Sequence, residues 1–353
     1  VDSLVRHADI AMYRAKSEGG ARIVFYSLEM NQAMQERLAL ENALREAVRS
    51  GQLRLHYQPQ VGMTDDTRLH GVEALLRWRH PEIGEISPAT FVPMAEECGL
   101  IDDLGRWTLE EACTQMADWR RRGVPVPRVS VNLSAINFEQ QDLPVFIGNV
   151  LGKCGLSPEE LMVEVTESVM ITEPTQALSA LRRLNALGVR IAIDDFGTGY
   201  SSLSLLQKFP IQCIKIDRAF VNDVSTDQAT QNIVRTIIAM AEAMGADVVA
   251  EGVEDKSQLQ TLKTLDCHRA QGYLISPPVD VHDVPVLEDL VAGNPVADLV
   301  VDRGADRLRV GLVATRCVVE WCRDALLHID HVVVAEFVNF VGRDTGFDKG
   351  LDV

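Results

Sequence analysis

Between residues 53 and about 280, short β-rich runs alternate with amphipathic helical stretches, and this alternation constrains the fold more than any other feature of the sequence. Strands joined by crossover helices form either a closed barrel or a doubly wound sheet. Eight candidate strands, most of them separated by helices, favour an α/β fold of the (β/α)8 TIM-type barrel class. The candidate strands are Leu53–Gln58, Leu69–Leu75, Arg128–Leu133, Leu161–Thr166, Val189–Ile193, Cys213–Ile216, Asp247–Ala250 and Arg269–Tyr273.

The link between the first two candidate strands departs from this pattern. Residues 62–68 are rich in turn-forming residues and leave no room for a helix. Two strands joined so closely pair as a hairpin, because a parallel pair needs a longer crossover. We therefore expect a barrel that is irregular at its start. Ser87 and Ser157 each precede a proline, and Glu160 completes a capping box in the second case, which marks the starts of two helices.

The two ends of the chain differ from the alternating region. Residues 1–26 read as one helix and one strand, too little to bury a core, and this predicts the remnant of a domain cut off upstream. Apolar residues recur on one stripe from Met34 to Val48, which is typical of a helix. The predicted organisation is a remnant at 1–26, a connecting helix at 27–51, the barrel at 52–294 and a C-terminal extension of unknown role at 295–353. Val284–Val291, near the end of the barrel part, is a candidate closing helix.

The net charge limits the classes of ligand. Acidic residues outnumber basic ones by 51 to 34, giving a formal charge of −17. A field of that sign repels nucleic-acid backbones, so neither DNA nor RNA is an expected partner. A small phosphate-bearing ligand remains compatible with it if bound divalent cations invert the local field.

The expected compartment is the cytoplasm. The seven cysteines include no CxxC pair, so neither a zinc site nor a disulfide framework is indicated. We find no apolar run long enough to span a bilayer and no signal peptide. The first residue is not Met, and an upstream part of the parent protein could carry a membrane anchor.

Polar residues with ligand chemistry recur at the ends of the candidate strands. The carboxyl ends of barrel strands converge on one mouth, where the active sites of such barrels lie. Ionised groups inside a barrel are costly unless they are paired or bind metal, so the repetition points to a shared site. The residues are Glu73, Asn132, Glu164, Asp194, Asp195, Lys215, Asp217, Glu251 and Gln271.

Their chemistry indicates a site for two metal ions. Adjacent Asp194 and Asp195 cannot both be ionised at close range without a compensating cation. Oxygen ligands suit magnesium or manganese rather than zinc. Two such ions activate water and stabilise an in-line displacement at phosphorus, and Lys215 could orient that water. The glycine-containing stretch 196–203 reads as a mobile loop that shapes the site.

The chain carries, in this order, the motifs Tyr57-Gln58-Pro59, Glu73–Trp78, Val131–Ser134, Glu164–Glu167, Asp194–Gly199, Lys215–Asp217, Glu251–Glu254 and Gln271–Tyr273. These motifs resemble the EAL-domain family. They cover roughly residues 33–280, and the ordered set is specific where any one motif is not. The resemblance implies a phosphodiesterase that converts cyclic di-GMP to linear pGpG on a barrel with one antiparallel strand, with magnesium or manganese as cofactor. It also implies a homodimer that forms next to the loop after Asp195.

The resemblance also implies a role for each matching residue. The ligands of one metal would be Glu73, Asn132, Glu164 and Asp194. The second metal or the attacking water would be served by Asp194, Asp195 and Glu251. Lys215 would contact that water, Glu251 could act as the general base, and Glu167 would brace the loop after Asp195. The substrate would be contacted by Gln58, Arg77, Glu254 and Gln271.

The N-terminal remnant has a resemblance of its own. Ala8–Lys16 is similar to the last helix of a GGDEF domain, the diguanylate cyclase family, whose active-site segment this sequence lacks. The resemblance implies that GGDEF and sensor domains precede this region in the parent protein, and that the helix at 31–49 connects the two domains.

Two other functions are compatible with parts of this pattern. A catalytically silent receptor for cyclic di-GMP would keep the ligand site but lack turnover. A magnesium-dependent barrel enzyme that stabilises an enolate would also place carboxylates at the barrel mouth. The adjacent aspartates and the glycine-containing loop favour phosphodiester chemistry over the second alternative.

Overall fold

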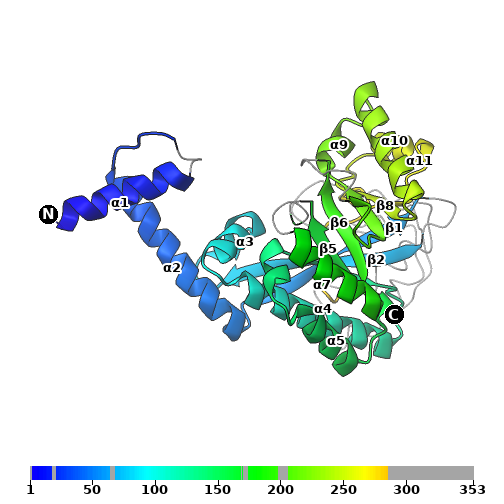
Figure 1. Cartoon of the computed structure of the whole chain (residues 1–353), viewed down its shortest axis with the longest axis horizontal. Coiled ribbons are helices and arrows are strands. Elements are labelled where there is room, and N and C mark those ends of the chain that lie inside the picture. Colours follow the sequence, from blue (N-terminus) through cyan, green and yellow to red (C-terminus); the bar gives the residue numbers. More distant parts are fainter. Residues whose placement is uncertain are drawn as a thin grey trace, which may run out of the picture. The chain divides into compact units, whose positions relative to one another are not determined.

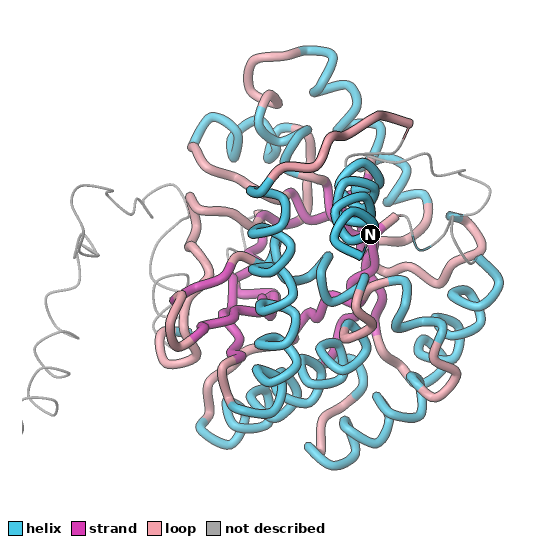
Figure 2. The backbone as a smooth tube through the Cα atoms, turned by 90° about the vertical axis from the view of Figure 1, so that its left-hand side faces the viewer, coloured by secondary structure: helices cyan, strands magenta, loops and turns pink. Residues whose placement is uncertain are grey.

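The strands of this protein close into a barrel. The computed structural model describes residues 2–17, 21–63, 68–167, 169, 174–197 and 206–284. The sheet order is β1-β9-β8-β7-β6-β5-β4-β2-β3, and an additional β1–β2 pairing closes the ring of strands, with helices around it (Figures 1 and 2). The strands are β1 (Leu53–Gly62), β2 (Leu69–His80), β3 (Gly84–Ile86), β4 (Val129–Leu133), β5 (Leu161–Thr166), β6 (Arg190–Phe196), β7 (Cys213–Ile216), β8 (Asp247–Ala250) and β9 (Arg269–Ala270).

One strand of the ring runs against the others. β1 is antiparallel to both β2 and β9, whereas the pairs from β2–β4 round to β8–β9 are parallel. The prediction of an irregular (β/α)8 barrel with one antiparallel strand is therefore confirmed. The short β3 was not predicted. It pairs with Trp78–His80 at the end of β2 and lies outside the ring.

Helices cover the outside of the barrel, and none of those described is long and apolar enough to cross a bilayer. Ser157 and Glu160 form the predicted capping box. Ser87 stands at the start of α3, as predicted, but its side chain makes no capping hydrogen bond. The helices are α1 (Asp2–Ser17), α2 (Leu28–Ser50), α3 (Pro88–Glu97), α4 (Ile101–Arg122), α5 (Leu143–Cys154), α7 (Pro174–Leu187), α9 (Arg218–Asn222), α10 (Gln228–Ala243) and α11 (Lys256–Thr264), with 3-10 turns η1 (Ala135–Glu139) and η2 (Pro158–Glu160).

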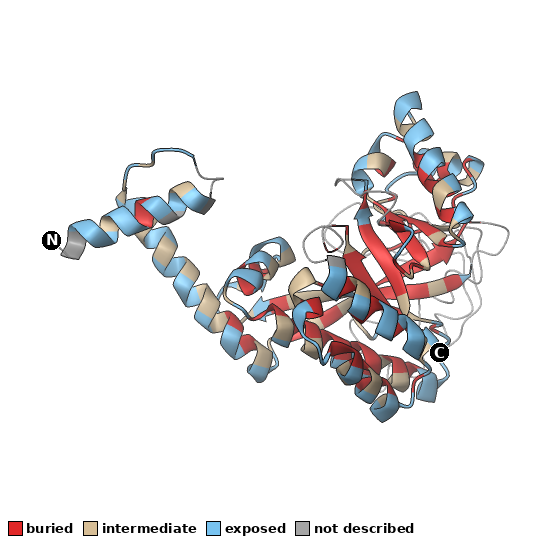
Figure 3. Ribbon diagram, viewed as in Figure 1, coloured by how far each residue is buried: buried red, intermediate tan, exposed pale blue. Residues whose placement is uncertain are grey.

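Successive side chains of each strand point alternately to an apolar core outside the ring of strands and to the interior of the barrel. In β6, Ile191 and Ile193 belong to the large buried cluster that the strands share with the surrounding helices, so the strands are buried (Figure 3). Ala192, between them, belongs to a second cluster with Met162, Cys213 and Val249 inside the ring. Because side chains alternate along a strand, every second residue of the ring faces this interior.

The connecting helix α2 packs against the barrel domain. Leu44 and Ala47 are buried in one cluster with Trp78, Phe91 and Leu104. Ser27 caps the first turn of α2 by accepting a hydrogen bond from the backbone N–H of Met30, so the helix begins three residues earlier than the predicted 31–49.

The strand predicted in residues 21–26 is wrong. These residues are irregular, and Ile23 and Phe25 are 88% and 86% exposed. No described strand pairs with this segment, and a single extended run without a partner cannot satisfy its backbone groups as a strand. Residues 285–353 lie outside the described residues, and these include the extension at 295–353 and all but the first residue of the candidate closing helix. The bounds of the four predicted parts stay predictions.

Gly272, two residues after the end of β9, is a position where any side chain collides with backbone. A Cβ there would lie 2.2 Å from both the N and the O of Val253. We expect Gly272→Ala to lower the free energy of unfolding by about 3 kcal/mol, because backbone cannot yield as a flexible side chain does. The matched control is Gly152→Ala in α5, where a Cβ meets nothing within 4 Å. That change should raise stability by up to about 1 kcal/mol. Urea denaturation measures both, and equal effects would contradict this packing.

Candidate active site

The residues expected at the strand ends face the same barrel interior. Residues opposite one another on adjacent strands point to the same face of a sheet. The sheet register pairs Gln58 with Glu73, Asn132 with Glu164, and Thr166 with Asp194. Asp194 follows Ala192 by two residues, and Ala192 lies in the interior cluster. The barrel therefore collects carboxylates and amides from different strands into one space.

One lysine joins these carboxylates. Lys215 on β7 is 1% exposed, and its ammonium forms ion pairs with four acidic residues. Its Nζ lies 3.3 Å from Glu73 Oε2, 3.2 Å from Asp194 Oδ1 and 2.7 Å from Glu251 Oε1, and it also contacts Glu164 Oε2. Burial opposes its charge, but the surrounding carboxylates raise the pKa of Lys215 well above its usual value. The lysine is therefore a permanent cation.

Glu73 is held by two amide groups in addition to Lys215. Asn132 Nδ2 donates to Glu73 Oε1 at 2.6 Å, and Gln271 Nε2 donates to Oε2 at 2.5 Å. Burial acts to raise the pKa of Glu73, but Lys215 and the two amide donors outweigh it and lower that pKa below its usual value. Because Asn132 turns its N–H toward Glu73, its carbonyl oxygen is the atom that could ligate a cation.

Glu164 and Glu251 are harder to ionise than Glu73. Burial and then the charge of Glu73 raise the pKa of Glu164 to about 8, and burial raises the pKa of Glu251 well above its usual value. Glu164 Oε1 is buried and has no hydrogen-bond partner in the described part of the chain. An unsatisfied buried oxygen costs roughly 1–3 kcal/mol, more if it is charged. A cation ligated by this oxygen would remove that cost, so the donor set fits a metal centre.

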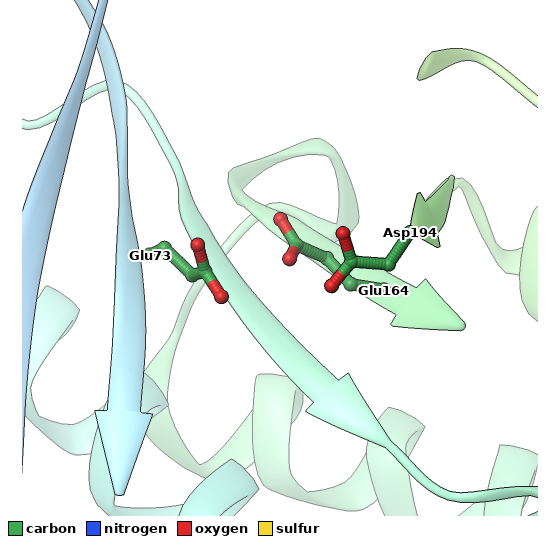
Figure 4. Close-up of side chains that lie close together, drawn as sticks. All are labelled: Glu73, Glu164 and Asp194. Atoms are coloured by element: carbon green, nitrogen blue, oxygen red, sulfur yellow. The ribbon is translucent and has the colours of Figure 1, made fainter. Parts of the chain in front are cut away.

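The carboxylates form two groups that share Asp194. In each group, Glu73–Glu164–Asp194 and Asp194–Asp195–Glu251, the ligand oxygens lie within 4.8 Å of one another. Figure 4 shows the first group, with three carboxylates from three strands directed into a common space. Carboxylates that ligate a metal are deprotonated. With all five ionised in this way, the centre and the Lys215 ammonium carry four negative charges, which two divalent cations would neutralise.

A backbone irregularity allows two consecutive aspartates to serve one centre. In a regular strand Asp194 and Asp195 would point to opposite faces. Here the register between β6 and β7 shifts after Ile193, and Asp195 has a φ of 53°, a left-handed conformation that few residues other than glycine adopt. Burial and the charge of Asp194 raise the pKa of Asp195 to about 6. This bulge is typical of strand ends beside functional sites.

Glu167 reaches the segment that follows Asp195. The backbone N–H of Gly197 donates to Glu167 Oε2 at 3.1 Å, and Glu167 is buried. This is the contact that a bracing role requires. Residues 198–203 of the expected loop 196–203 lie outside the described residues.

The sequence matches the EAL domain family over residues 41–278. This chain belongs to the EAL domain family. The match begins inside α2 and ends beyond β9, so it includes all the strands of the barrel and every residue assigned above to the carboxylate centre.

Relatives of this EAL domain include two longer bacterial proteins. The first is the bifunctional diguanylate cyclase/cyclic di-GMP phosphodiesterase MucR of Pseudomonas aeruginosa, 43% identical over 276 residues that cover 78% of this chain and 40% of MucR. The second is the cyclic di-GMP phosphodiesterase PdeR of Escherichia coli, 40% identical over 277 residues that cover 78% of this chain and 42% of PdeR. This chain thus spans about two fifths of the length of these curated relatives.

A solved structure, the PaMucR phosphodiesterase in complex with c-di-GMP, has the same fold as this EAL domain. The TM-score is 0.67 with 42% sequence identity, covering 70% of this chain and 99% of that one. Phosphodiesterases of this family depend on metal, and the carboxylate groups described above are consistent with that dependence.

The four expected substrate contacts differ in this EAL domain. Glu254 is exposed and Arg77 is partly buried. Burial lowers the pKa of Arg77, and its Nη1 donates to the carbonyl oxygen of Leu76 at 2.9 Å. Gln58 and Gln271 are buried instead, and their amide groups bond to protein atoms. The structure thus brings Gln58 and Gln271 to the carboxylate centre as neighbours of Glu73.

Sequence reasoning missed Gln60. Its Nε2 donates to Gln271 Oε1 at 2.9 Å, and the residue is 4% exposed. The available signal was its spacing, because a residue two positions after Gln58 on the same strand faces the same side of the sheet.

Proposed function

We propose that this EAL domain hydrolyses cyclic di-GMP to linear pGpG in second-messenger signalling, with two divalent ions, magnesium or manganese, as cofactors. The observation that carries the proposal is the pair of carboxylate groups sharing Asp194 around the Lys215 ammonium. The activities named for MucR and PdeR and the c-di-GMP complex of the related structure support the choice of substrate. The all-oxygen donor set supports magnesium or manganese over zinc.

The donors divide into two sets. Glu73, Asn132, Glu164 and Asp194 would hold one ion, and Asp194, Asp195 and Glu251 the other. When bound, such ions lower the pKa of water and stabilise the charge that develops on the attacking and leaving oxygens.

Proton transfer falls to Glu251 and charge stabilisation to Lys215. In the reaction, the oxygen of water bonds to phosphorus as the bond between phosphorus and a ribose 3′ oxygen breaks. Glu251, whose pKa burial raises, can accept the proton that water loses. Lys215 keeps its own proton because the carboxylates raise its pKa, so it orients the nucleophile and offsets negative charge. Glu167 would brace the loop after Asp195 through Gly197.

The substrate contacts are proposals of the same kind. Arg77 provides a guanidinium for phosphate, and Glu254 provides a carboxylate that can accept hydrogen bonds from guanine. Gln58 and Gln271 would lie beneath the substrate, where Gln271 donates to Glu73 and Gln58 accepts from Gln271. They could contact the substrate with the acceptor capacity that these internal bonds leave.

The arrangement of the parent protein is also a proposal. The resemblance of Ala8–Lys16 supports a GGDEF remnant at 1–26, and upstream GGDEF and sensor domains are the expected partners of the connector 27–51. A homodimer through the barrel 52–294 is proposed from the resemblance to the EAL-domain family. A cytoplasmic location is proposed from the cysteine pattern of the sequence. The role of 295–353 stays open.

Product analysis by chromatography tests the activity. The purified chain with cyclic di-GMP should yield pGpG in magnesium and in manganese, and none after the metal is removed with EDTA. Tight binding of cyclic di-GMP without product under both metals would replace the hydrolase with the receptor function.

A further inference from the structure

Three glutamines line the barrel interior beside Glu73. Gln58 and Gln60 lie two residues apart on β1, and Gln271 follows β9. They are 8%, 4% and 4% exposed, so their amide groups cannot rely on bulk water for hydrogen bonds. We name Gln58, Gln60 and Gln271 the glutamine relay.

The direction of hydrogen bonding in the relay is fixed at one end by backbone. Gln58 bonds to the carbonyl oxygen of Ser276 at 3.0 Å, and a carbonyl can only accept, so the Gln58 atom there is Nε2. The amide oxygen of Gln58 then faces Gln271 at 3.1 Å, which requires Nε2 of Gln271 at that contact. The orientation of two buried amides thus follows from one backbone acceptor.

The other end of the relay is fixed by a carboxylate. Gln271 Nε2 also donates to Glu73 Oε2, so both of its N–H groups are used. If the Gln271 amide were rotated by 180°, its oxygen would face two acceptors, Gln58 Oε1 and Glu73 Oε2. The remaining group of Gln271 is Oε1, and it accepts from Gln60 Nε2 at 2.9 Å.

We infer that Gln60 is a positioning residue of the metal centre, which acts on Glu73 through Gln271. Its N–H satisfies the one group of Gln271 that the other contacts leave open, and this locks the amide that donates to Glu73. The inference rests on the proposed function insofar as Glu73 is a metal ligand. Gln60 itself makes no hydrogen bond to a carboxylate of the centre in the described part of the chain.

A double-mutant cycle on manganese binding tests the inference. Gln60→Met keeps the length of the side chain but removes the donor, and we expect about 10-fold weaker Mn²⁺ binding, the lower end of the effect of removing an outer-shell partner. Gln271→Met should weaken binding further. In the Gln271→Met background, Gln60→Met should not weaken Mn²⁺ binding further, because Gln60 acts on Glu73 only through the Gln271 amide. Free Mn²⁺ is measured by electron paramagnetic resonance, with thermal unfolding as a check of folding.

The matched control is Gln115→Met on α4. Gln115 Nε2 is also buried but makes no hydrogen bond to any residue that the structure describes, and its loss should leave Mn²⁺ affinity unchanged. If Gln60→Met does not fold, Gln60→Glu at pH 8 replaces it. The extra negative charge alone would strengthen Mn²⁺ binding, whereas loss of the donor is expected to weaken it.

The outcomes separate the inference from the proposed function. Affinity within two-fold of wild type in Gln60→Met, or additive losses in the double variant, would overturn the role of Gln60. Wild-type protein that binds Mn²⁺ but forms no pGpG would overturn the proposed function, while the manganese data still decide the role of Gln60. Wild-type protein that binds no Mn²⁺ would overturn both.

Discussion

Glu73→Gln is expected to lower the turnover of cyclic di-GMP by more than about 100-fold. Removing a group that only supports a metal ligand costs up to roughly that factor, and Glu73 is assigned as a ligand itself. The variant loses the charge, and its own NH₂ must face Asn132 or Gln271, both of which donate to Glu73. Steady-state kinetics at saturating magnesium, with Mn²⁺ binding measured in parallel, give the effect.

Glu82→Gln is the matched control for this change. Glu82 is an exposed glutamate in the turn between β2 and β3, and its substitution should leave turnover unchanged. If the Glu73→Gln protein keeps more than a tenth of wild-type turnover, the assignment of Glu73 as a metal ligand is wrong.

Lys215→Met is expected to produce the largest change in stability. Lys215 balances four buried carboxylates, and removal of one partner from a buried charge cluster costs about 3–5 kcal/mol. Divalent cations compensate the same carboxylates, so the loss should be smaller in excess magnesium than in EDTA. Thermal or urea unfolding of the variant and wild type, in both conditions, measures the difference.

Turnover of Lys215→Met separates the role of Lys215 in stability from its role in the reaction. With magnesium present, Lys215→Met should bind cyclic di-GMP but lose most of its rate, because the charge beside the nucleophile is gone. Lys208→Met, at an exposed lysine, should change stability by less than about 0.5 kcal/mol. Equal losses of stability with and without magnesium would show that cations do not share these carboxylates with Lys215.

Much of the fold could be predicted because its signals are local. The eight strand runs and the short link at 62–68 specify the barrel and its antiparallel start, and polar residues at strand ends identify the mouth. What the sequence did not reveal depends on contacts between distant segments. β3 forms because it pairs with the end of β2, whereas the run at 21–26 has no described strand beside it.

In the candidate site, too, some features have local sequence signals and others depend on contacts between distant segments. The ligand candidates could be named from their positions after strands, but the bulge that turns Asp195 is a feature of register between β6 and β7. The contacts of Gln271 with Gln58 and Glu73 join residues about 200 positions apart, and no local pattern reveals them. The spacing of Gln60 from Gln58 indicates which face of β1 it lies on, but its partner Gln271 is known only once β1 and β9 are neighbours.

Anomalous diffraction from crystals grown with manganese and cyclic di-GMP tests the metal centre most directly. Because manganese is expected to support turnover, the two manganese peaks are expected beside a phosphate of the bound nucleotide, whether this is cyclic di-GMP or pGpG. One should contact Glu73, Asn132, Glu164 and Asp194, and the other Asp194, Asp195 and Glu251. Substrate bound in the barrel with no manganese at these carboxylates would contradict the two-ion mechanism.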